Sequence, residues 1–163
     1  MKIELKENFM VVKFKKLSNT AKIPQYMSEF AAGMDICADI NEPVIVNPGE
    51  VVNIGTGLAM EMERQFGDDT NHNFAAFIFG RSGLGIKHGI HPANAVGVID
   101  SDYRGEIRVG LCNVSKIPYM IQPGERIAQI VIMPVLHRPV IEETDELSST
   151  SRSDGGFGST GKV

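Results

Sequence analysis

The sequence of 163 residues contains no tryptophan and only two cysteines, Cys37 and Cys112. The cysteines form no CxxC pair and have no histidine at a metal-ligand spacing, so neither a zinc module nor a disulfide framework is expected. We predict two reduced, buried thiols in a cytoplasmic protein. Neither a GxSxG motif nor a Cys–His dyad can be picked out from the sequence.

Long apolar runs are also missing. The longest run, Ile130 to Leu136, contains Pro134 and is far shorter than the roughly 20 residues that a membrane-spanning helix needs. The first residues, MKIELKEN, are too polar for the apolar core of a secretory signal. We therefore expect no membrane association and a cytoplasmic location.

An excess of basic residues is absent as well, because the formal net charge is -4. Binding to a nucleic-acid backbone usually requires a basic face, so no nucleic-acid partner is expected. A smaller phosphate ligand remains compatible with this charge if a few basic groups converge. The four histidines show no HExxH or other zinc spacing and are interpreted as non-ligands: His72, His88, His91 and His137.

What the sequence does contain is a succession of short strand patterns separated by turn signals, in a chain of one domain's length. This pattern predicts an all-β sandwich, jelly roll or barrel. The expected strands are Val11–Phe14, Val51–Ile54, Phe74–Phe79, Ala95–Ile99, Glu106–Asn113 and Ile127–Ile132. Two copies of one turn, Asn47-Pro48-Gly49-Glu50 and Gln122-Pro123-Gly124-Glu125, predict type II geometry with glycine at positive φ.

Helical patterns are scarce. Gln25–Ala32 is expected to hold a turn or two of helix, and Ser82–Lys87 about one turn. No alternation of strand and helix is present, so a parallel α/β sheet is not expected.

Two segments differ from the rest of the chain. Residues 64–73 (RQFGDDTNHN) are polar and predict a solvated hairpin loop. The tail from Glu146 to Val163 is rich in Ser, Thr and Gly and cannot fold alone. We divide the chain into a β domain, residues 1–145, and an arm, residues 146–163, which is either disordered or becomes ordered on a ligand.

Several motifs point to a chemical function, and some of these signals are more specific than others. Gly156-x-Gly158-x-x-Gly161 matches a dinucleotide fingerprint, but the two residues after it leave no room for the helix that the motif requires. The segment Gly80–Lys87 combines glycines with Arg81 and Ser82, and it suits either an anion-binding nest or an ordinary turn.

Two further segments place acids at defined points. Asp100-Ser101-Asp102-Tyr103-Arg104-Gly105 joins two strand patterns, and by itself it is either a hairpin tip or a base beside a stacking platform. Asp35 stands inside an apolar stretch, where it either accepts hydrogen bonds from a turn or holds a water of a metal ion.

Taken together, these segments resemble the five ordered motifs of the homotrimeric dUTPase family, from about residue 20 to the end. The matching segments are Ala32–Ile36, Gly80–Gly85, Gly97–Gly105, Arg126–Ile130 and Arg152–Gly161. Five motifs in order are far more specific than any one of them. The resemblance implies a jelly-roll-like fold, a flexible glycine-rich C-terminal arm, and Mg²⁺-assisted hydrolysis of dUTP to dUMP and pyrophosphate.

The resemblance also implies a role for individual residues. Asp100 would activate the water that attacks the α-phosphorus, with Gln129 assisting at the phosphates. Asp35 would hold Mg²⁺ through a water. The substrate-binding set would be Arg81, Ser82, Gly83, Asn94, Val98, Ile99, Tyr103, Arg152, Phe157, Gly158, Ser159 and Thr160. Asn94 belongs to a hairpin that reads uracil, and Tyr103 would pack under the deoxyribose and leave no room for a 2′-hydroxyl. In this family the site is built from three chains, so a homotrimer is expected.

Three departures from the family pattern stand out. Ser153 replaces a usual glycine in the fifth motif, which would weaken arm closure if that position needs positive φ. Gly80 replaces a frequent proline. The 64–73 loop is longer than usual, and we hypothesise that it is dispensable for catalysis and contacts a protein partner.

Three alternatives were weighed against this interpretation. A dCTP deaminase would need a glutamate as general base where this chain has Gly110, so neither a deaminase nor a bifunctional enzyme is expected. A nucleotide-sensing regulator is disfavoured as a catalytically dead protein, since Asp100 and the tail are retained, but an enzyme that also regulates remains open. A structural β-protein would require five coincidental motifs.

Overall fold

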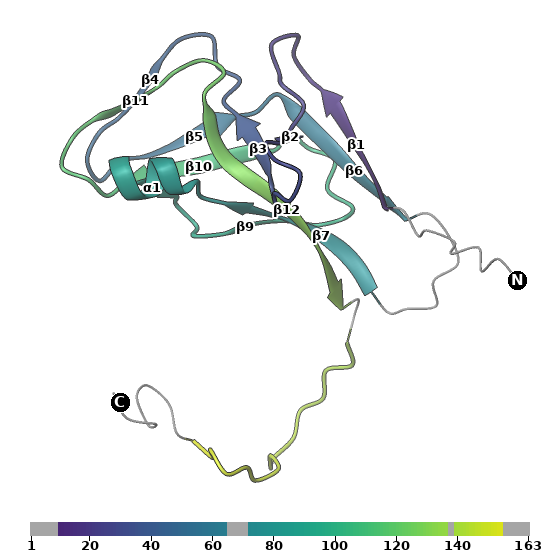
Figure 1. Ribbon diagram of the computed structural model, residues 1–163. Helices are drawn as coiled ribbons and strands as arrows, with labels where there is room; N and C mark the ends of the chain where they lie inside the picture. The colour runs from purple at the N-terminus through teal and green to yellow at the C-terminus, as the bar shows by residue number, and fades with distance from the viewer. Residues whose placement is uncertain (1–9, 65–71, 137–138, 155–163) are drawn as a thin grey trace, which may run out of the picture.

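The protein is represented by a computed structural model, which describes residues 10–64, 72–136 and 139–154. Within these ranges it contains twelve β-strands and one short helix (Figure 1). In order they are β1 (Met10–Lys16), β2 (Gln25–Tyr26), β3 (Met34–Cys37), β4 (Val44–Val46), β5 (Val51–Gly55), β6 (Leu58–Arg64), β7 (His72–Phe79), α1 (Ser82–His88), β8 (Ile90–Pro92), β9 (Gly97–Ile99), β10 (Arg108–Asn113), β11 (Tyr119–Ile121) and β12 (Arg126–Leu136). The prediction of an all-β fold is confirmed.

All strand pairs are antiparallel. The largest sheet has the order β2-β3-β12-β7-β9, and a second sheet has the order β5-β10-β8. Two-stranded ribbons, β1-β6 and β11-β4, complete the structure. In Figure 1, β12 crosses the molecule between β3 and β7. Neighbours in the sheets come from distant parts of the chain, as in a jelly roll.

The hydrophobic core lies between the two larger sheets. Ile36 of β3 and Ile130 of β12 pack in one cluster with Leu111 of β10 and Ile90 of β8, and all four are at most 1% exposed. Burying such side chains contributes about 1.5–3 kcal/mol each before entropy is counted. This single core fixes the sheets on which the site residues stand.

The two repeated turns have the predicted geometry. Gly49 and Gly124 have φ values of 77° and 73°. In each turn the N–H of the closing glutamate, Glu50 or Glu125, donates to the carbonyl of the first residue, at 3.0 and 3.1 Å. The same glutamates also accept the N–H of that first residue through their carboxylates, at 2.8 Å in both turns. Positive φ at glycine and the closing hydrogen bond together identify type II turns.

The helix predicted for Gln25–Ala32 is wrong, whereas the one predicted for Ser82–Lys87 is confirmed as α1. Residues 25 and 26 form the edge strand β2 instead. Met27 and Phe30 are 62% and 91% exposed, so a helix here would have had no apolar face to bury against the core.

Two strands begin later in the structure than the sequence predicted. Ala95 was expected in a strand, but it has φ 61° and lies in a turn, so β9 begins at Gly97. The strand expected from Glu106 begins at Arg108. Sequence reasoning did not mark β2, β3, β4, β6, β8 or β11 as strands, most of which are short.

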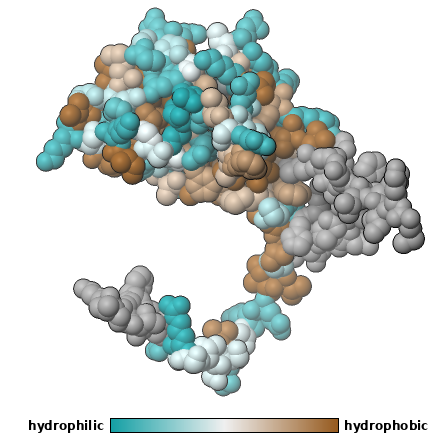
Figure 2. Space-filling view, viewed as in Figure 1, coloured by the Kyte–Doolittle hydropathy of each residue, from teal (hydrophilic) through white to brown (hydrophobic). Residues whose placement is uncertain are grey.

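After β12 the chain leaves the sheets. Residues 139–154 contain no strand or helix, and every one of them is exposed. Figure 1 shows this segment running away from the domain, and Figure 2 shows hydrophobic residues along it, where Val140 and Ile141 are more than 90% exposed. Across the described ranges, no helix has the length and apolar character required to span a bilayer.

Candidate active site

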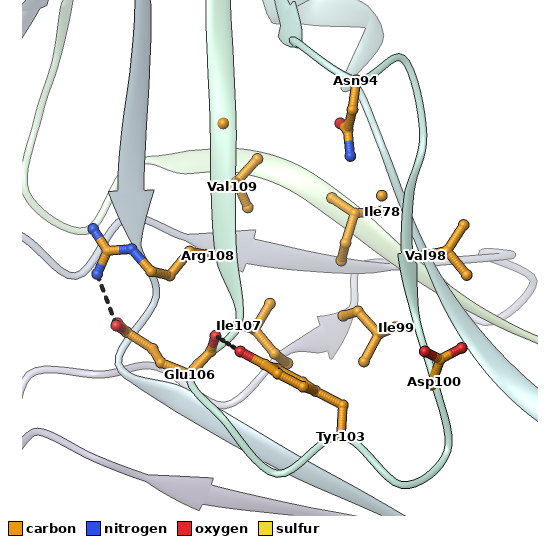
Figure 3. A pocket seen from close by; sticks show the side chains of 12 residues that line it. Ile78, Asn94, Val98, Ile99, Asp100, Tyr103, Glu106, Ile107, Arg108 and Val109 are labelled. Carbon is orange, nitrogen blue, oxygen red and sulfur yellow. Dashed lines mark hydrogen bonds and ion pairs between the residues drawn. The ribbon is translucent and has the colours of Figure 1, made fainter.

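A pocket of about 280 Å³ opens between the hairpin that follows β9 and the strand β10 (Figure 3). Its lining residues are Ile78, Asn94, Gly97, Val98, Ile99, Asp100, Tyr103, Glu106, Ile107, Arg108, Val109 and Gly110. We call it the base pocket. Five residues predicted for the site therefore line one cavity: Asn94, Val98, Ile99, Asp100 and Tyr103.

Close backbone approaches shape the base pocket. A Cβ atom on Gly97 would lie 3.1 Å from the Cβ of Ile78, a tight contact that a larger residue could make only if β7 or β9 gave way slightly. Asn94 lies in a tight turn, since the N–H of Ala95 donates to the carbonyl of Pro92 at 3.0 Å. The N–H of Ala93 donates to the carbonyl of Gly110 at 2.8 Å and holds this turn against β10.

Tyr103 and Asp100 belong to the hairpin that closes one side of the pocket. The Tyr103 hydroxyl donates to the carbonyl of Glu106 at 3.0 Å, and the Tyr103 N–H donates to the carbonyl of Asp100 at 3.1 Å. Tyr103 as a whole is 46% exposed, so a ligand can reach this residue. The Asp100 side chain is exposed at the end of β9.

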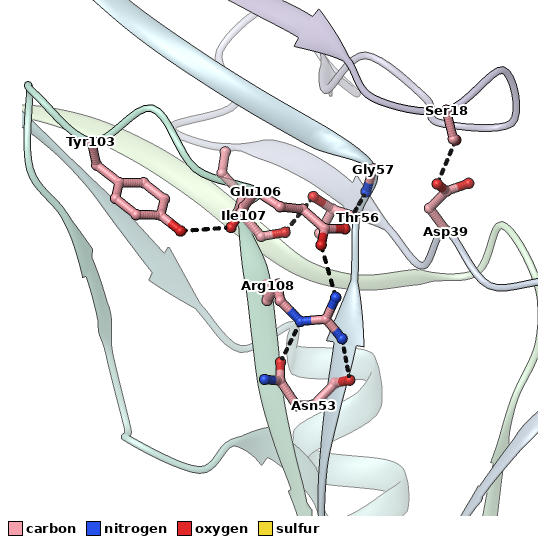
Figure 4. Close-up of polar contacts among 9 residues, drawn as sticks. All are labelled: Ser18, Asp39, Asn53, Thr56, Gly57, Tyr103, Glu106, Ile107 and Arg108. Atoms are coloured by element: carbon pink, nitrogen blue, oxygen red, sulfur yellow. Dashed lines mark hydrogen bonds and ion pairs between the residues drawn. The ribbon is translucent and has the colours of Figure 1, made fainter.

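A polar network fixes this hairpin to the neighbouring strands (Figure 4). One carboxylate oxygen of Glu106 accepts the N–H of Gly57 at 3.0 Å, and the other accepts from Arg108 at 2.8 Å. Arg108 in turn donates to the side chain and carbonyl of Asn53, at 3.3 and 3.0 Å. Glu106 thus holds the carbonyl that positions the Tyr103 hydroxyl. Sequence reasoning did not identify Glu106, because its partner Gly57, in the turn after β5, is distant in sequence.

A second group of predicted residues surrounds Asp35. Arg81 Nε donates to one oxygen of this carboxylate and Arg126 Nη1 to the other, both at 2.9 Å. Arg81 Nη1 also donates to the carbonyl of Arg126 at 3.0 Å. We call Asp35, Arg81 and Arg126 the arginine cluster. Its formal charge is +1, and it is partly buried, with 15% of the Asp35 side chain and 25% of the Arg81 side chain exposed.

The arginine cluster extends to the next strand. Gln129 is the register partner of both Asp35 and Phe79, and its Nε2 donates to the carbonyl of Gly80 at 3.0 Å. Ser82 and Gly83 follow Arg81 in the first turn of α1, and both are exposed. A Cβ on Gly83 would meet nothing within 4 Å, so this corner is open to solvent.

The base pocket and the arginine cluster lie apart within one chain. Ile99 pairs with Ala76 on β7, whereas Gln129 pairs with Phe79 on the same strand. This offset corresponds to roughly 10 Å along the strand. Asp100 lies further still from the level of Gln129, and among the described residues no hydrogen bond or ion pair joins the two groups. One chain therefore presents two separate parts of the predicted site.

The fifth motif is only partly described. Arg152 and Ser153 are exposed, and Ser153 has φ 47°, the left-handed conformation that favours glycine. The predicted residues Phe157, Gly158, Ser159 and Thr160 lie outside the described residues. The hairpin loop predicted for residues 64–73 is wrong in its bounds and its kind: Arg64 ends β6, His72 begins β7, and these two strands belong to different sheets. Residues 65–71 lie outside the described residues.

Cys37 and Cys112 are both free, as predicted, but both are half-buried instead of fully buried. No Cys–His dyad could be picked out from the sequence, but the structure brings one cysteine against a histidine ring. Cys112 Sγ lies 3.4 Å from His91 Nε2 and 3.5 Å from His91 Nδ1. The pair was invisible in the sequence because only the pairing of β10 with β8 brings the two residues together.

Among the residues that the structure describes, no three His, Cys, Asp or Glu side chains gather as a metal-binding cluster. Asp35 is the acidic group nearest the cations of the arginine cluster, and both its oxygens already accept hydrogen bonds. This donor set suits a hard divalent ion that is held chiefly by ligand phosphates and waters, with one carboxylate nearby.

Comparison with known proteins gives a consistent family. A family model described as dUTPase matches residues 19–161. The chain is 51% identical over 153 residues to the deoxyuridine 5′-triphosphate nucleotidohydrolase of Nautilia profundicola, covering 94% of this chain and 100% of that protein. It is 43% identical over 147 residues to the protein of the same name from Idiomarina loihiensis, covering 90% of this chain and 92% of that protein.

Solved structures agree at the level of the fold. The dUTPase of Staphylococcus bacteriophage 80alpha, in complex with dUPNHPP, superposes with a TM-score of 0.76 and 27% identity. The match covers 93% of this chain and 98% of that one. That protein is described among phage dUTPases that control the transfer of virulence genes by a G protein-like mechanism.

Proposed function

The chain belongs to the dUTPase family and hydrolyses dUTP to dUMP and pyrophosphate; from this premise we propose how its own residues carry out the reaction. The observation that carries the proposal is the base pocket, where Asp100 and Tyr103 share one hairpin opposite the turn that holds Asn94. The reaction keeps uracil out of DNA and supplies dUMP for thymidylate synthesis.

Asp100 is the proposed general base. Its exposed carboxylate stands at the end of β9, where a water can lie between it and a bound α-phosphate. Accepting a proton from that water raises its nucleophilicity toward phosphorus. The bond from the α-phosphorus to the bridging oxygen then breaks, and pyrophosphate leaves.

The base pocket is the proposed uracil and deoxyribose site. The Asn94 turn presents main-chain groups to the base, and the close contact of Gly97 with Ile78 limits the space for a thymine methyl group. Val98 and Ile99 line the same cavity. The Tyr103 ring, held by its bond to Glu106, packs under the sugar and excludes a 2′-hydroxyl.

The arginine cluster and its neighbours are the proposed phosphate site. Arg81, Ser82 and Gly83 donate to phosphate oxygens, and Gln129 assists from β12. Asp35 holds Arg81 in place by accepting its Nε–H. Members of the family use a divalent metal ion, and we propose Mg²⁺, held through water by Asp35. The bound ion would neutralise phosphate charge as it develops.

A homotrimer is the proposed assembly, since a single chain presents the two parts of the site separately. The exposed tail supports an arm that reaches another subunit: Arg152 would clamp the outer phosphates and Phe157 would stack on the base. Gly158, Ser159 and Thr160 would complete the closure around the substrate. A cytoplasmic location also remains a prediction.

The decisive experiment is pyrophosphate release from dUTP, dCTP, dTTP and UTP, with and without Mg²⁺, for the wild type and Asp100→Asn. We expect rapid hydrolysis of dUTP alone, dependent on the metal and lost in the variant. Binding of dUTP without release of pyrophosphate would overturn the assignment. Ammonia release from dCTP would revive the deaminase alternative, which the glycine at position 110 argues against.

A second role, dUTP-dependent binding of a protein partner, is favoured by the description of the phage 80alpha protein. We propose that the 64–73 loop makes this contact and is dispensable for catalysis. A deletion confined to residues 65–71, which spares β6 and β7, should retain turnover and lose any partner captured in the presence of dUTP. Loss of turnover in the deletion variant would contradict the proposal.

A further inference from the structure

Glu106 stands where the hairpin of the base pocket rejoins the sheet, just before β10 begins at Arg108. Its carbonyl accepts the Tyr103 hydroxyl at 3.0 Å, while the N–H of the same peptide unit, on Ile107, donates to the carbonyl of Leu58 at 2.7 Å. The N–H and the C=O of a planar trans peptide point in opposite directions. This one peptide unit therefore joins the start of β6 on one side and the Tyr103 phenol on the other.

Two glycines leave the space that this arrangement needs. A Cβ atom on Gly105 would collide with the hydroxyl oxygen of Tyr103, so a side chain at this position would displace the phenol. A Cβ atom on Gly55 would lie 2.7 Å from Oε1 of Glu106 and 3.2 Å from Nη1 of Arg108. The ion pair of Glu106 with Arg108 thus lies against the bare backbone at the end of β5.

The carboxylate of Glu106 holds its own backbone from two directions (Figure 4). One oxygen accepts the N–H of Gly57 at 3.0 Å, and the other accepts from Arg108 Nη1 at 2.8 Å. Arg108 also donates to the side chain and the carbonyl of Asn53 on β5. The side chain of Glu106 is only 29% exposed, so solvent screens these charge-assisted bonds in part. The carboxylate therefore ties the base of the hairpin to β5 and the turn that follows it.

The position of the Tyr103 ring matters for the proposed contact with the sugar. A ring held in one place leaves no room for a 2′-hydroxyl, whereas a ring that can shift lets the added oxygen fit. Such a contact has to be held to within about 0.5 Å by neighbouring groups. In the described part of the chain the Tyr103 hydroxyl makes one hydrogen bond, so its acceptor, the carbonyl of Glu106, decides where the ring lies.

We propose that Glu106 is a specificity-determining positioning residue, whose carboxylate fixes the Tyr103 ring and so sets the discrimination between dUTP and UTP. It acts through Tyr103 and takes no part in the chemical step. The inference rests on the proposed contact between Tyr103 and the deoxyribose. It assigns a role to a carboxylate that the mechanism above leaves without one.

The first test replaces the carboxylate by an amide of the same length. In Glu106→Gln the amide oxygen can accept the N–H of Gly57, but the NH₂ group then faces the donors of Arg108. We expect the preference for dUTP over UTP, as a ratio of kcat/KM values, to fall about fivefold, with UTP assayed at high enzyme concentration. A general loss of stability would lower kcat/KM for both nucleotides alike and leave the ratio unchanged.

Glu125 supplies a matched control in the same chain. Its carboxylate also accepts a phenol, that of Tyr119 at 2.6 Å, and a main-chain N–H, that of Gln122 at 2.8 Å. This second glutamate belongs to the turn before β12 and does not line the base pocket. Glu125→Gln should leave the dUTP/UTP ratio unchanged, and an equal fall in both glutamine variants would overturn the proposal.

The second test is a double-mutant cycle of Glu106→Gln with Tyr103→Phe. If Glu106 acts through the Tyr103 hydrogen bond, the double variant should lose about fivefold in the ratio, as each single variant does. Independent effects would multiply to about 25-fold and would overturn the proposal. An unchanged ratio in Glu106→Gln alone would refute only the role of Glu106. An unchanged ratio in both single variants would also refute the proposed role of the Tyr103 hydrogen bond in sugar selection.

Discussion

The base pocket and the arginine cluster prepare for a ligand in opposite ways. The pocket is a shape held by hydrogen bonds within one chain, from Tyr103 to Glu106 and from Glu106 to Gly57. The cluster instead concentrates positive charge. Asp35 holds two guanidinium groups in place, and its own negative charge offsets part of theirs. In the proposed mechanism, the pocket selects the nucleoside and the cluster stabilises the phosphates electrostatically.

The largest effect should come from Asp100, the pocket residue that we propose as the general base. We expect Asp100→Asn to lower kcat for dUTP by about 10³-fold, because an amide cannot accept the proton. Calorimetry should find the Kd for dUTP changed by less than about threefold. Asp102→Asn, an exposed acid on the same hairpin, is the control. A matching loss of affinity in Asp100→Asn would place this residue in binding only.

The second-largest effect on activity should come from the arginine cluster. Arg81→Lys keeps the positive charge but cannot donate to Asp35 and to the Arg126 carbonyl in the same planar geometry. We expect kcat/KM for dUTP to fall about 100-fold. Arg126→Lys, which removes a single bond to Asp35 at a more exposed position, should cause a smaller loss. Equal losses would mean that only net charge counts.

One hydrogen bond that shapes the base pocket can be removed without changing the charge of the protein. Tyr103→Phe removes the hydrogen bond to Glu106, which contributes about 1 kcal/mol. We expect the preference for dUTP over UTP, taken as a ratio of kcat/KM values, to fall about fivefold. Tyr119→Phe removes a phenol that donates to Glu125 at a remote turn, and it should leave the ratio unchanged. An unaltered ratio in Tyr103→Phe would separate sugar selection from this hydrogen bond.

The smallest effect should come from the arm. Ser153 holds φ 47°, a conformation that costs a serine roughly 1 kcal/mol. Ser153→Gly should therefore lower KM for dUTP by about two- to fivefold. Ser151→Gly changes a nearby serine that does not share the positive φ, and it should have no such effect. An unchanged KM and kcat in Ser153→Gly would refute the idea that this serine weakens closure.

Sequence reasoning succeeded where the signal was local. Pro48-Gly49 and Pro123-Gly124 dictated their turns, because proline presets one dihedral angle and glycine permits the next. The five motifs are each contiguous, so they could be found in the sequence, and five of the predicted site residues line one pocket; their roles stay predictions. The helix predicted for residues 25–32 failed, since local propensity was outweighed by the lack of any core surface for Met27 and Phe30.

Contacts between distant strands could not be predicted. The bonds of Asp35 to Arg81 and Arg126 span 46 and 91 positions, and the anchoring of Glu106 to Gly57 spans 49. Each depends on strand order and register, which a single sequence does not reveal. The Cys112–His91 pair belongs to the same class of contact.

The exposed tail after β12 also bears on how activity should change when the enzyme is diluted. From Leu136 to Arg152 an extended chain reaches at most about 55 Å, well beyond the radius of a domain of this size. The arm is joined covalently to its own domain through this segment. Its effective concentration near a site within reach is therefore in the millimolar range, whatever the concentration of enzyme in solution. In the proposed homotrimer, closure of the arm should therefore be insensitive to dilution until the subunits separate, and activity should then fall abruptly.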